Sequence, residues 1–343
     1  MVKLNIHLKF LYLFIGIIFI SIMYSTKAIS IDNVSKPEKC TVSATGVVTI
    51  TTNTGCTFQP DEQKVTFYQV DFCKAVPTAP TLTSNMIKNN CSTFFKNETG
   101  AEINIEYQNG TGIGTESDYS AMPYGTYTHA IITMGTVFKY KSTVTFASAN
   151  VNDSLGDGTN GRNNASSGHS TCVTKASTPA IKWGFANFGG VGRTLTQDFD
   201  KGTIDCGTGL TAQEISVGIN TIGGMDGENC KTSGRFVGTD TNVDVFLIDT
   251  SGNLVNGTSE AGCVENGKGT GDRIIGVMPL SLKIDRNTSG FRVKYNNKNG
   301  IYINFGSDSN APFWITDLDS AYIDMTITAV QKRTRRPRTG AWR

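Results

Sequence analysis

Short stretches in which apolar and polar residues alternate recur along most of this chain. The clearest is AEINIEY (101–107), in which Ile103, Ile105 and Tyr107 fall on one side of an extended strand and acidic or amide side chains on the other. A period of two residues is the pattern of a strand with one face in the core and the other in water. This stretch therefore predicts a half-buried strand.

A second stretch, KVTFYQVDF (64–72), carries apolar residues on both sides. Strict alternation gives one side Val65, Phe67, Gln69 and Asp71. It gives the other side Thr66, Tyr68, Val70 and Phe72. Because both faces are partly apolar, we expect a central strand of a sandwich.

Turn residues between other stretches predict two hairpins. TYTHAIITMG (126–135) and TVFKYKSTVTFA (136–147) resemble two arms that meet at Gly135, and NNKNG (296–300) is a strong turn signal between the stretches on either side of it. The other predicted strands are 46–52, 243–249, 273–285, 290–296, 300–306 and 321–330.

The character of the chain changes at about 148–235, where turn-forming Gly, Asn and Ser are frequent and no periodicity is seen. We interpret this region as a long insertion or a second small subdomain held by disulfides. Runs of strands without alternating helices favour a sandwich or barrel over an α/β sheet. The predicted fold is all-β: a disulfide-stapled β-sandwich at 59–331 that holds the Gly/Asn/Ser-rich insertion and follows an N-terminal disulfide hairpin at 31–58.

Residues 1–30 have the features of an export signal. Lys3 and Lys9 precede FLYLFIGIIFISIMY (10–24), which is uncharged, and AIS (28–30) puts small residues at a cleavage site. The run is shorter than the roughly 20 residues of a membrane helix. A cleaved signal peptide is therefore favoured over an uncleaved anchor. We expect no transmembrane helix in the mature chain, and a location in the periplasm, on the outer surface or outside the cell.

All eight cysteines lie beyond residue 30, and an even number in an exported chain indicates disulfides. No close C-x-x-C pair points to a metal site. We favour pairing between neighbours, because the first four cysteines are well separated from the last four. The predicted pairs are Cys40–Cys56, Cys73–Cys91, Cys172–Cys206 and Cys230–Cys263.

Charge is distributed unevenly. Residues 332–343 hold six basic residues and no acid, whereas 31–331 hold 22 basic and 29 acidic residues. We interpret 332–343 as a disordered basic tail, for which a solvated end is the favoured interpretation and contact with an anionic envelope surface or another copy of the chain is the functional one. The acidic body argues against nucleic acid. The surface-contact candidates are Arg333, Arg335, Arg336 and Arg338.

A resemblance supports the fold. PYGTYTHAIITMG (123–135), which follows KVTFYQVDFC (64–73), resembles a group of exported transthyretin-like, or prealbumin-like, β-sandwich proteins of unknown function. In that group a Pro-x-Gly-x-Tyr turn starts a strand, and a late pair of strands follows a loop like the one in 278–305. The resemblance covers 64–147 and 243–330. It implies a sandwich and export, and it carries over no functional residue.

GHSTC (168–172) is the most enzyme-like stretch. A nucleophile elbow requires G-x-S-x-G after a hydrophobic strand and before a helix. Here Cys172 takes the place of the last Gly, and the preceding residues are polar. His169 is tied to the backbone beside Ser170, and His129 lies in a predicted strand. We therefore expect a surface loop beside a disulfide and no catalytic serine.

One loop offers oxygen ligands for calcium. Asp153, Asp157 and Asn160 lie in NDSLGDGTNG, whose glycines permit the turns of such a site. The stretch lacks the D-x-D-x-D-G spacing and a distal Glu, so solvated turns are the favoured interpretation. We expect no cofactor, with calcium as the alternative.

These features predict an exported, non-catalytic protein of the cell envelope or the extracellular space with a binding or structural role. No residue pattern identifies catalytic or cofactor-binding residues. The alternative is a secreted enzyme acting on polysaccharide, which requires two carboxylates about 5 to 9.5 Å apart in a pocket.

Export can be tested on the protein itself. N-terminal sequencing of the mature form should give a start near Ile31, because small residues at 28 and 30 precede that position. A protein that retains Met1 in a soluble cytoplasmic fraction would contradict the signal peptide.

Overall fold

The computed structural model describes part of the chain. The described residues are 33–35, 39–49, 56–105, 112–147, 170–174, 184–186, 204–206, 209–222, 233–237, 242–255, 271–308, 311–315 and 322–332. The chain divides into two compact units, Met1–Ser30 and Ile31–Arg343, and all described residues lie in the second. They form strands and one short 3₁₀ helix, η1 (Glu116–Asp118), so the all-β prediction is confirmed. Among them no helix is long and apolar enough to span a membrane.

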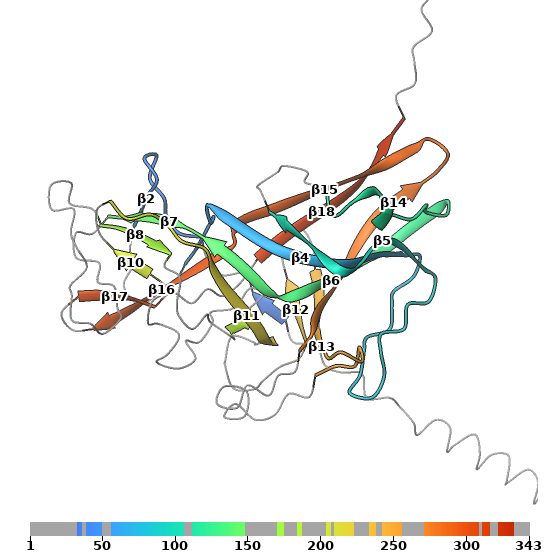
Figure 1. Cartoon of the computed structure of the whole chain (residues 1–343), viewed down its shortest axis with the longest axis horizontal. Helices are drawn as coiled ribbons and strands as arrows, with labels where there is room; N and C mark the ends of the chain where they lie inside the picture. Colours follow the sequence, from blue (N-terminus) through green and yellow to red (C-terminus); the bar gives the residue numbers. More distant parts are fainter. Residues whose placement is uncertain are drawn as a thin grey trace, which may run out of the picture. The chain divides into compact units, whose positions relative to one another are not determined.

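The largest sheet is built around one long strand, β6 (Gly125–Lys141) (Figure 1). β4 (Glu62–Cys73) pairs with β6 on one side and with β5 (Cys91–Asn104) on the other. At the opposite edge of β6, β14 (Arg273–Ile284) pairs with its first part and β11 (Ile215–Ile222) with its last part. The sheet continues to β13 (Asn242–Ile248), β12 (Ser233–Val237), β1 (Asn33–Ser35) and β9 (Gly184–Ala186).

Three smaller sheets complete the described structure. The four-stranded sheet contains β10 (Ile204–Cys206), β8 (Ser170–Thr174), β7 (Thr143–Phe146) and β2 (Val47–Val48). The three-stranded sheet contains β17 (Ala311–Ile315), β16 (Ile301–Asp308) and β3 (Cys56–Phe58). The two-stranded sheet contains β15 (Thr288–Asn299) and β18 (Tyr322–Gln331), which are antiparallel.

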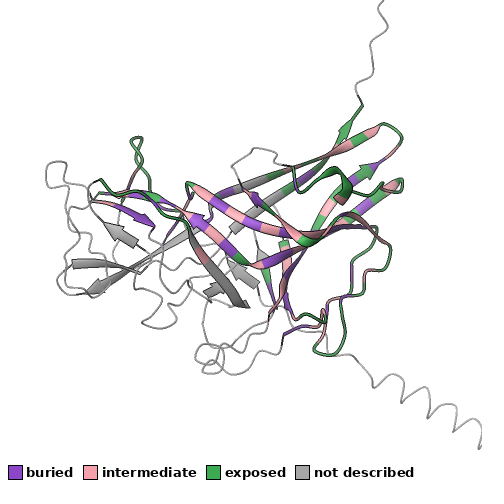
Figure 2. Ribbon diagram, viewed as in Figure 1, coloured by how far each residue is buried: buried purple, intermediate pink, exposed green. Residues whose placement is uncertain are grey.

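The sandwich core lies where the β15–β18 pair packs on β4 and β5. The ring of Phe291 in β15 lies 5.3 Å from that of Phe72 and 4.6 Å from that of Phe94, centroid to centroid. Figure 2 shows buried and more exposed residues following one another along β4 and β6, as expected of sheets with one face in a core. Burial of one large apolar side chain contributes about 1.5–3 kcal/mol, so this aromatic contact is a main source of stability between the layers.

A register shift in β4 corrects the predicted faces of that strand. Val65, Phe67, Val70 and Phe72 all belong to one buried core, although strict alternation puts the first two and the last two on opposite sides. The pairing of β4 with both neighbours shifts between Phe67 and Gln69. A bulge of this kind turns the following residues to the other face, so the alternation restarts after it.

The hairpin predicted about Gly135 is wrong, because β6 runs through this residue without a break. Val65 pairs with Phe138 and Phe67 with Met134, so β6 advances four residues while β4 advances two. A Cβ atom at Gly135 would lie 3.5 Å from the ring of Tyr68. Gly135 therefore marks a bulge under a neighbouring side chain and not a chain reversal.

The hairpin predicted at NNKNG is also wrong. The turn exists, with the Gly300 amide donating to the Asn297 carbonyl at 2.9 Å, but β15 pairs with β18, and β16 pairs with β3 and β17. The turn is buried: Asn297 is 2% exposed, and its Nδ2 donates to the Ile105 carbonyl at 2.8 Å. This buried turn connects β15, in the two-stranded sheet, to β16, in the three-stranded sheet.

The structure confirms two of the predicted disulfides, Cys40–Cys56 and Cys73–Cys91. Cys172 in β8 is disulfide-bonded and lies opposite Cys206 in the register of β10, the partner that neighbour pairing predicts. Cys230 and Cys263 lie outside the described residues. In the chain-entropy model, closing a loop of the length between Cys73 and Cys91 contributes about 3 kcal/mol.

Much of the predicted insertion at 148–235 lies outside the described residues. The described pieces of it belong to sheets that also contain strands of the body. β11 pairs with β6 in the large sheet, and β8 pairs with β7.

Candidate functional site

Most residues that the sequence singles out for a site lie outside the described part of the chain. These are Asp153, Asp157 and Asn160 of the calcium candidate and Arg333, Arg335, Arg336 and Arg338 of the basic tail. They remain predictions. Within the described ranges, no group of three His, Cys, Asp or Glu residues is arranged to hold a metal ion.

The surface loop predicted at GHSTC is wrong for its last three residues, because Ser170 begins strand β8. Ser170 pairs with Phe146 of β7, and Cys172 and Val173 of the same strand are buried. A nucleophile elbow places its serine on a sharp turn between a strand and a helix. The backbone at Ser170 is an extended strand and does not have that geometry.

His129 is a strand residue of β6, as predicted, with Cys73 and Pro279 as its partners on the two sides. Its Nδ1 lies 2.9 Å from the Thr128 hydroxyl. Burial lowers the pKa of His129 from its ordinary value, and the carboxylate of Asp244 acts in the opposite direction. That carboxylate forms an ion pair with Arg235, so it is already engaged.

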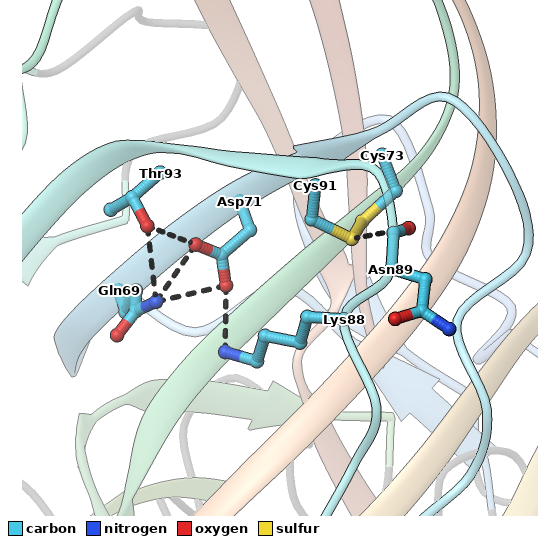
Figure 3. A network of polar contacts seen from close by, with 7 residues as sticks. All are labelled: Gln69, Asp71, Cys73, Lys88, Asn89, Cys91 and Thr93. Carbon is cyan, nitrogen blue, oxygen red and sulfur yellow. Dashed lines mark hydrogen bonds and ion pairs between the residues drawn. A yellow bond between two sulfur atoms is a disulfide. The ribbon is translucent and has the colours of Figure 1, made fainter.

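A buried carboxylate, Asp71 in β4, forms the densest polar cluster among the described residues (Figure 3). Its side chain is 2% exposed. Lys88 Nζ lies 2.7 Å from Oδ2, the Thr93 hydroxyl donates to Oδ1 at 2.7 Å, and Gln69 Nε2 donates to both oxygens at 2.7 and 3.0 Å. Both oxygens therefore have protein donors, as a buried charge requires.

This cluster fixes a loop and offers no reactive group. Lys88 belongs to the segment 74–90, whose two ends are joined by the Cys73–Cys91 disulfide. The same segment is paired with itself at Thr78 and Ile87, and its Thr81 carbonyl accepts from the Leu254 amide at 2.9 Å. The ion pair to Asp71 holds this loop against the sheet, so we assign the cluster a structural role.

A cavity of about 780 Å³ lies between β5, the segment that ends in η1 and the β15–β18 pair. This volume is in the range of small-molecule and cofactor sites, about 300–1,000 Å³. The lining residues are Phe94, Gly112, Ile113, Tyr119, Gly290, Phe291, Arg292, Val293, Lys294 and Val330. These described residues combine aromatic and aliphatic surface with two cations, and no carboxylate, histidine, cysteine or serine is among them.

Aromatic rings form one wall of this cavity. The Phe94 ring lies 4.6 Å from Phe291 at a steep angle and 5.0 Å from Tyr119, and Tyr119 also lies 5.5 Å from Phe95. Edge-to-face and tilted pairs at these distances are favourable arrangements for aromatic rings. The wall is thus part of the core packing that joins the two layers.

A short loop closes one side of the cavity and is held in place by Tyr119. Its hydroxyl donates to the Ile113 carbonyl at 2.5 Å and accepts from the Ile113 amide at 3.1 Å. Burial raises the pKa of the Tyr119 hydroxyl above its ordinary value. The two bonds clamp both ends of the loop 113–119, so its shape does not depend on a ligand.

Asp118 holds the same loop from within. Its Oδ2 accepts from the Thr115 amide at 2.7 Å, from the Thr115 hydroxyl at 3.0 Å and from Asn97 Nδ2 at 3.3 Å. The Thr115 amide bond lowers the pKa of the Asp118 carboxyl below its ordinary value of 3.8. Gly114 has a φ of 67°, and a Cβ atom there would collide with Asp118, so a glycine is needed for this close turn.

The two cations of the lining come from β15 and are exposed. Arg292 and Lys294 alternate along the strand with Phe291 and Val293, which pack against the core. Neither cation forms an ion pair with a described residue, and both stand beside an aromatic wall. The arrangement is suited to a ligand that has an apolar part and negative charge.

No local pattern in the sequence predicts this cavity. GFRVKYN (290–296) predicts a strand with alternating apolar and basic residues, and that strand exists as part of β15. Tyr119 lies in a polar segment, and Phe94 is far from Phe291 along the chain. Only the packing of the sheets brings the three rings together.

No family model, no curated protein and no solved structure matches the chain. The resemblance to transthyretin-like sandwiches stays a prediction.

The structural role of Asp71 predicts a large effect on stability. Asp71→Ala leaves Lys88, Thr93 and Gln69 without their acceptor, so the free energy of unfolding should fall by about 2–4 kcal/mol in urea denaturation. The matched control is Lys96→Ala, which removes an exposed ion pair with Glu98 and should change stability by about 0.5 kcal/mol or less. Equal effects of the two substitutions would contradict the role given to Asp71.

The hydrogen bonds of Asp118 predict a pH dependence of the loop. A carboxyl whose folded-state pKa is lowered contributes stability above the unfolded value, near 3.8, and loses it as the pH falls through the folded value. The amide resonance of Thr115 should therefore titrate with a midpoint below pH 3.8 in NMR spectra. Asp118→Asn should abolish that titration, and a midpoint at or above 3.8 in the unmodified protein would refute the interpretation.

Proposed function

We propose that this protein is an exported, non-catalytic binding protein of the cell envelope or the extracellular space, and that its ligand occupies the cavity beside Phe94, Tyr119 and Phe291. The observation that supports the proposal is the composition of this cavity. It joins an aromatic wall to the exposed cations Arg292 and Lys294. A ligand with an apolar or aromatic part and an anionic group matches both features.

Export is supported by two independent features. The sequence of residues 1–30 has the pattern of a signal peptide, and the disulfides Cys40–Cys56 and Cys73–Cys91 are of the kind that persists in oxidising compartments. The acting form of the protein would then be the chain from about Ile31 onward.

The lining favours binding over polysaccharide hydrolysis. Glycoside hydrolysis uses two carboxyl groups that flank the scissile bond. The described lining residues include no Asp or Glu, and Asp118, a carboxylate of the adjoining loop, already accepts hydrogen bonds from Thr115 and Asn97. Rings and cations hold a ligand without supplying a general acid and base.

The proposal can be tested with 1-anilinonaphthalene-8-sulfonate, an aromatic anion whose fluorescence rises on binding. Gly290 lines the cavity, no atom lies within 4 Å of the place of its Cβ, and its φ lies outside the left-handed region. Gly290→Trp should fill the cavity without backbone strain and weaken dye binding at least about tenfold, which is 1.4 kcal/mol.

The control for this test is Val137→Trp, which puts the same ring on an exposed position of β6. It should leave dye affinity unchanged, and both variants should keep the circular dichroism of the unmodified protein. If the dye binds all three proteins equally, the cavity is not its site and the proposal fails.

A further inference from the structure

One wall of the cavity consists of five consecutive residues of β15, Gly290–Lys294. Side chains alternate between the two faces of a strand, so a ligand that lies over one face meets every second residue. Residues of both faces of β15 therefore contribute to the lining, so the cavity reaches the backbone N–H and C=O groups of the strand, and Val330 of β18, the register partner of Gly290, lines it as well.

This edge has no partner strand among the described residues. The ladder of β15 is with β18 alone, and no other backbone hydrogen bond links Gly290–Lys294 to the described chain. In an antiparallel pair, the backbone groups of alternate residues point away from the partner. Those of β15 point to the side on which no described strand pairs with it.

The neighbouring edge of β5, in contrast to that of β15, is covered by another segment of the chain. Its Phe94 carbonyl accepts from the Ser120 amide at 2.9 Å, and Phe95 is bridged to Tyr119. The chain thus covers the edge of β5 with the segment after η1, while no described residue pairs with the second edge of β15. The open edge is about 17 Å long, from five residues at about 3.4 Å each.

We propose, on the basis of the binding function above, that the ligand is an extended acidic segment of a partner protein that adds as a strand to the edge of β15. Its backbone pairs with Gly290–Lys294. Alternate apolar side chains enter the cavity beside Phe94 and Phe291, and the acidic side chains between them lie near Arg292 and Lys294. Strand addition takes affinity from the backbone bonds and specificity from the side-chain pockets.

The charges select this occupant over a second copy of the chain. If two copies paired through their β15 edges, each would bring Arg292 and Lys294 toward the same cations of the other. Like charges opposite one another destabilise a strand pair, and opposite charges stabilise it. Two further exposed cations flank these strands in the chain: Arg286 lies just before β15, and Lys332 lies just after β18. They add to the preference for an acidic partner.

The probes are three synthetic peptides measured by calorimetry on the full mature protein. The first is acetyl-DVDFDVD-amide, which alternates acidic and apolar residues. The second replaces each Asp by Lys, and the third carries N-methyl groups on alternate residues of the first, which removes their amide donors. Only the first should bind well. N-methylation should weaken binding at least about tenfold, because it removes backbone bonds and keeps the side chains.

Protein variants test the charges and the place of binding. The double variant Arg292→Glu with Lys294→Glu should reverse the preference, so that the Lys peptide binds more tightly than the Asp peptide. The control double variant Lys39→Glu with Lys141→Glu makes the same change of charge elsewhere and should keep the original preference. Gly290→Trp should abolish binding of the first peptide.

The outcomes separate this inference from the proposed function. One outcome is that Gly290→Trp blocks binding of the dye while no peptide binds the unmodified protein. The cavity is then a binding site, and strand addition is overturned. Equal affinity for the N-methylated peptide would likewise overturn strand addition. If sedimentation shows self-association that Gly290→Trp abolishes, the edge belongs to a second copy and the acidic partner is overturned. If neither dye nor peptide binds, both proposals fail.

Discussion

The packing of Phe291 against Phe72 and Phe94 holds the β15–β18 pair on the large sheet. An isolated two-stranded pair is marginal in water, so β15 and β18 depend on this contact for their position. Two of these rings, Phe94 and Phe291, also line the cavity, and the adjacent residues of β15 supply its cations. The contact that joins the layers therefore also sets the shape of the site, and a change that loosens the core there would alter the cavity as well.

Local patterns predicted the structure well where the outcome depends on neighbouring residues. In 101–105 the alternation is obeyed, with Ile103 and Ile105 buried and Glu102 exposed. The disulfides Cys40–Cys56 and Cys73–Cys91 follow from nearness along the chain, and the second joins residues that face each other across β4 and β5. Antiparallel neighbours joined by one connection place such residues opposite each other, so sequence separation was a sufficient guide.

The errors came where distant parts of the chain decide the conformation. Gly135 and Gly300 both look like hairpin glycines, yet one lies in a continuous strand beneath Tyr68 and the other in a buried turn fastened by Asn297. The bulge after Phe67 could not be predicted from the sequence for the same reason, since only the pairing of β4 with its two neighbours reveals it. The cavity needs rings from β5, from Tyr119 just after η1 and from β15, which no local window of sequence contains.

The two strand edges beside the cavity show how the fold separates stability from binding. The edge of β5 is closed by Tyr119 and Ser120, and the Tyr119 hydroxyl fixes the covering loop to Ile113. A loop held in this way costs little to order when a ligand arrives, which favours affinity. The second edge of β15 is unpaired among the described residues, and the strand carries Arg292 and Lys294. Charge on an exposed edge is a common protection against unspecific pairing. The same two cations that discourage pairing between copies leave the edge available to a strand of opposite charge, so protection and selectivity follow from one placement of charge.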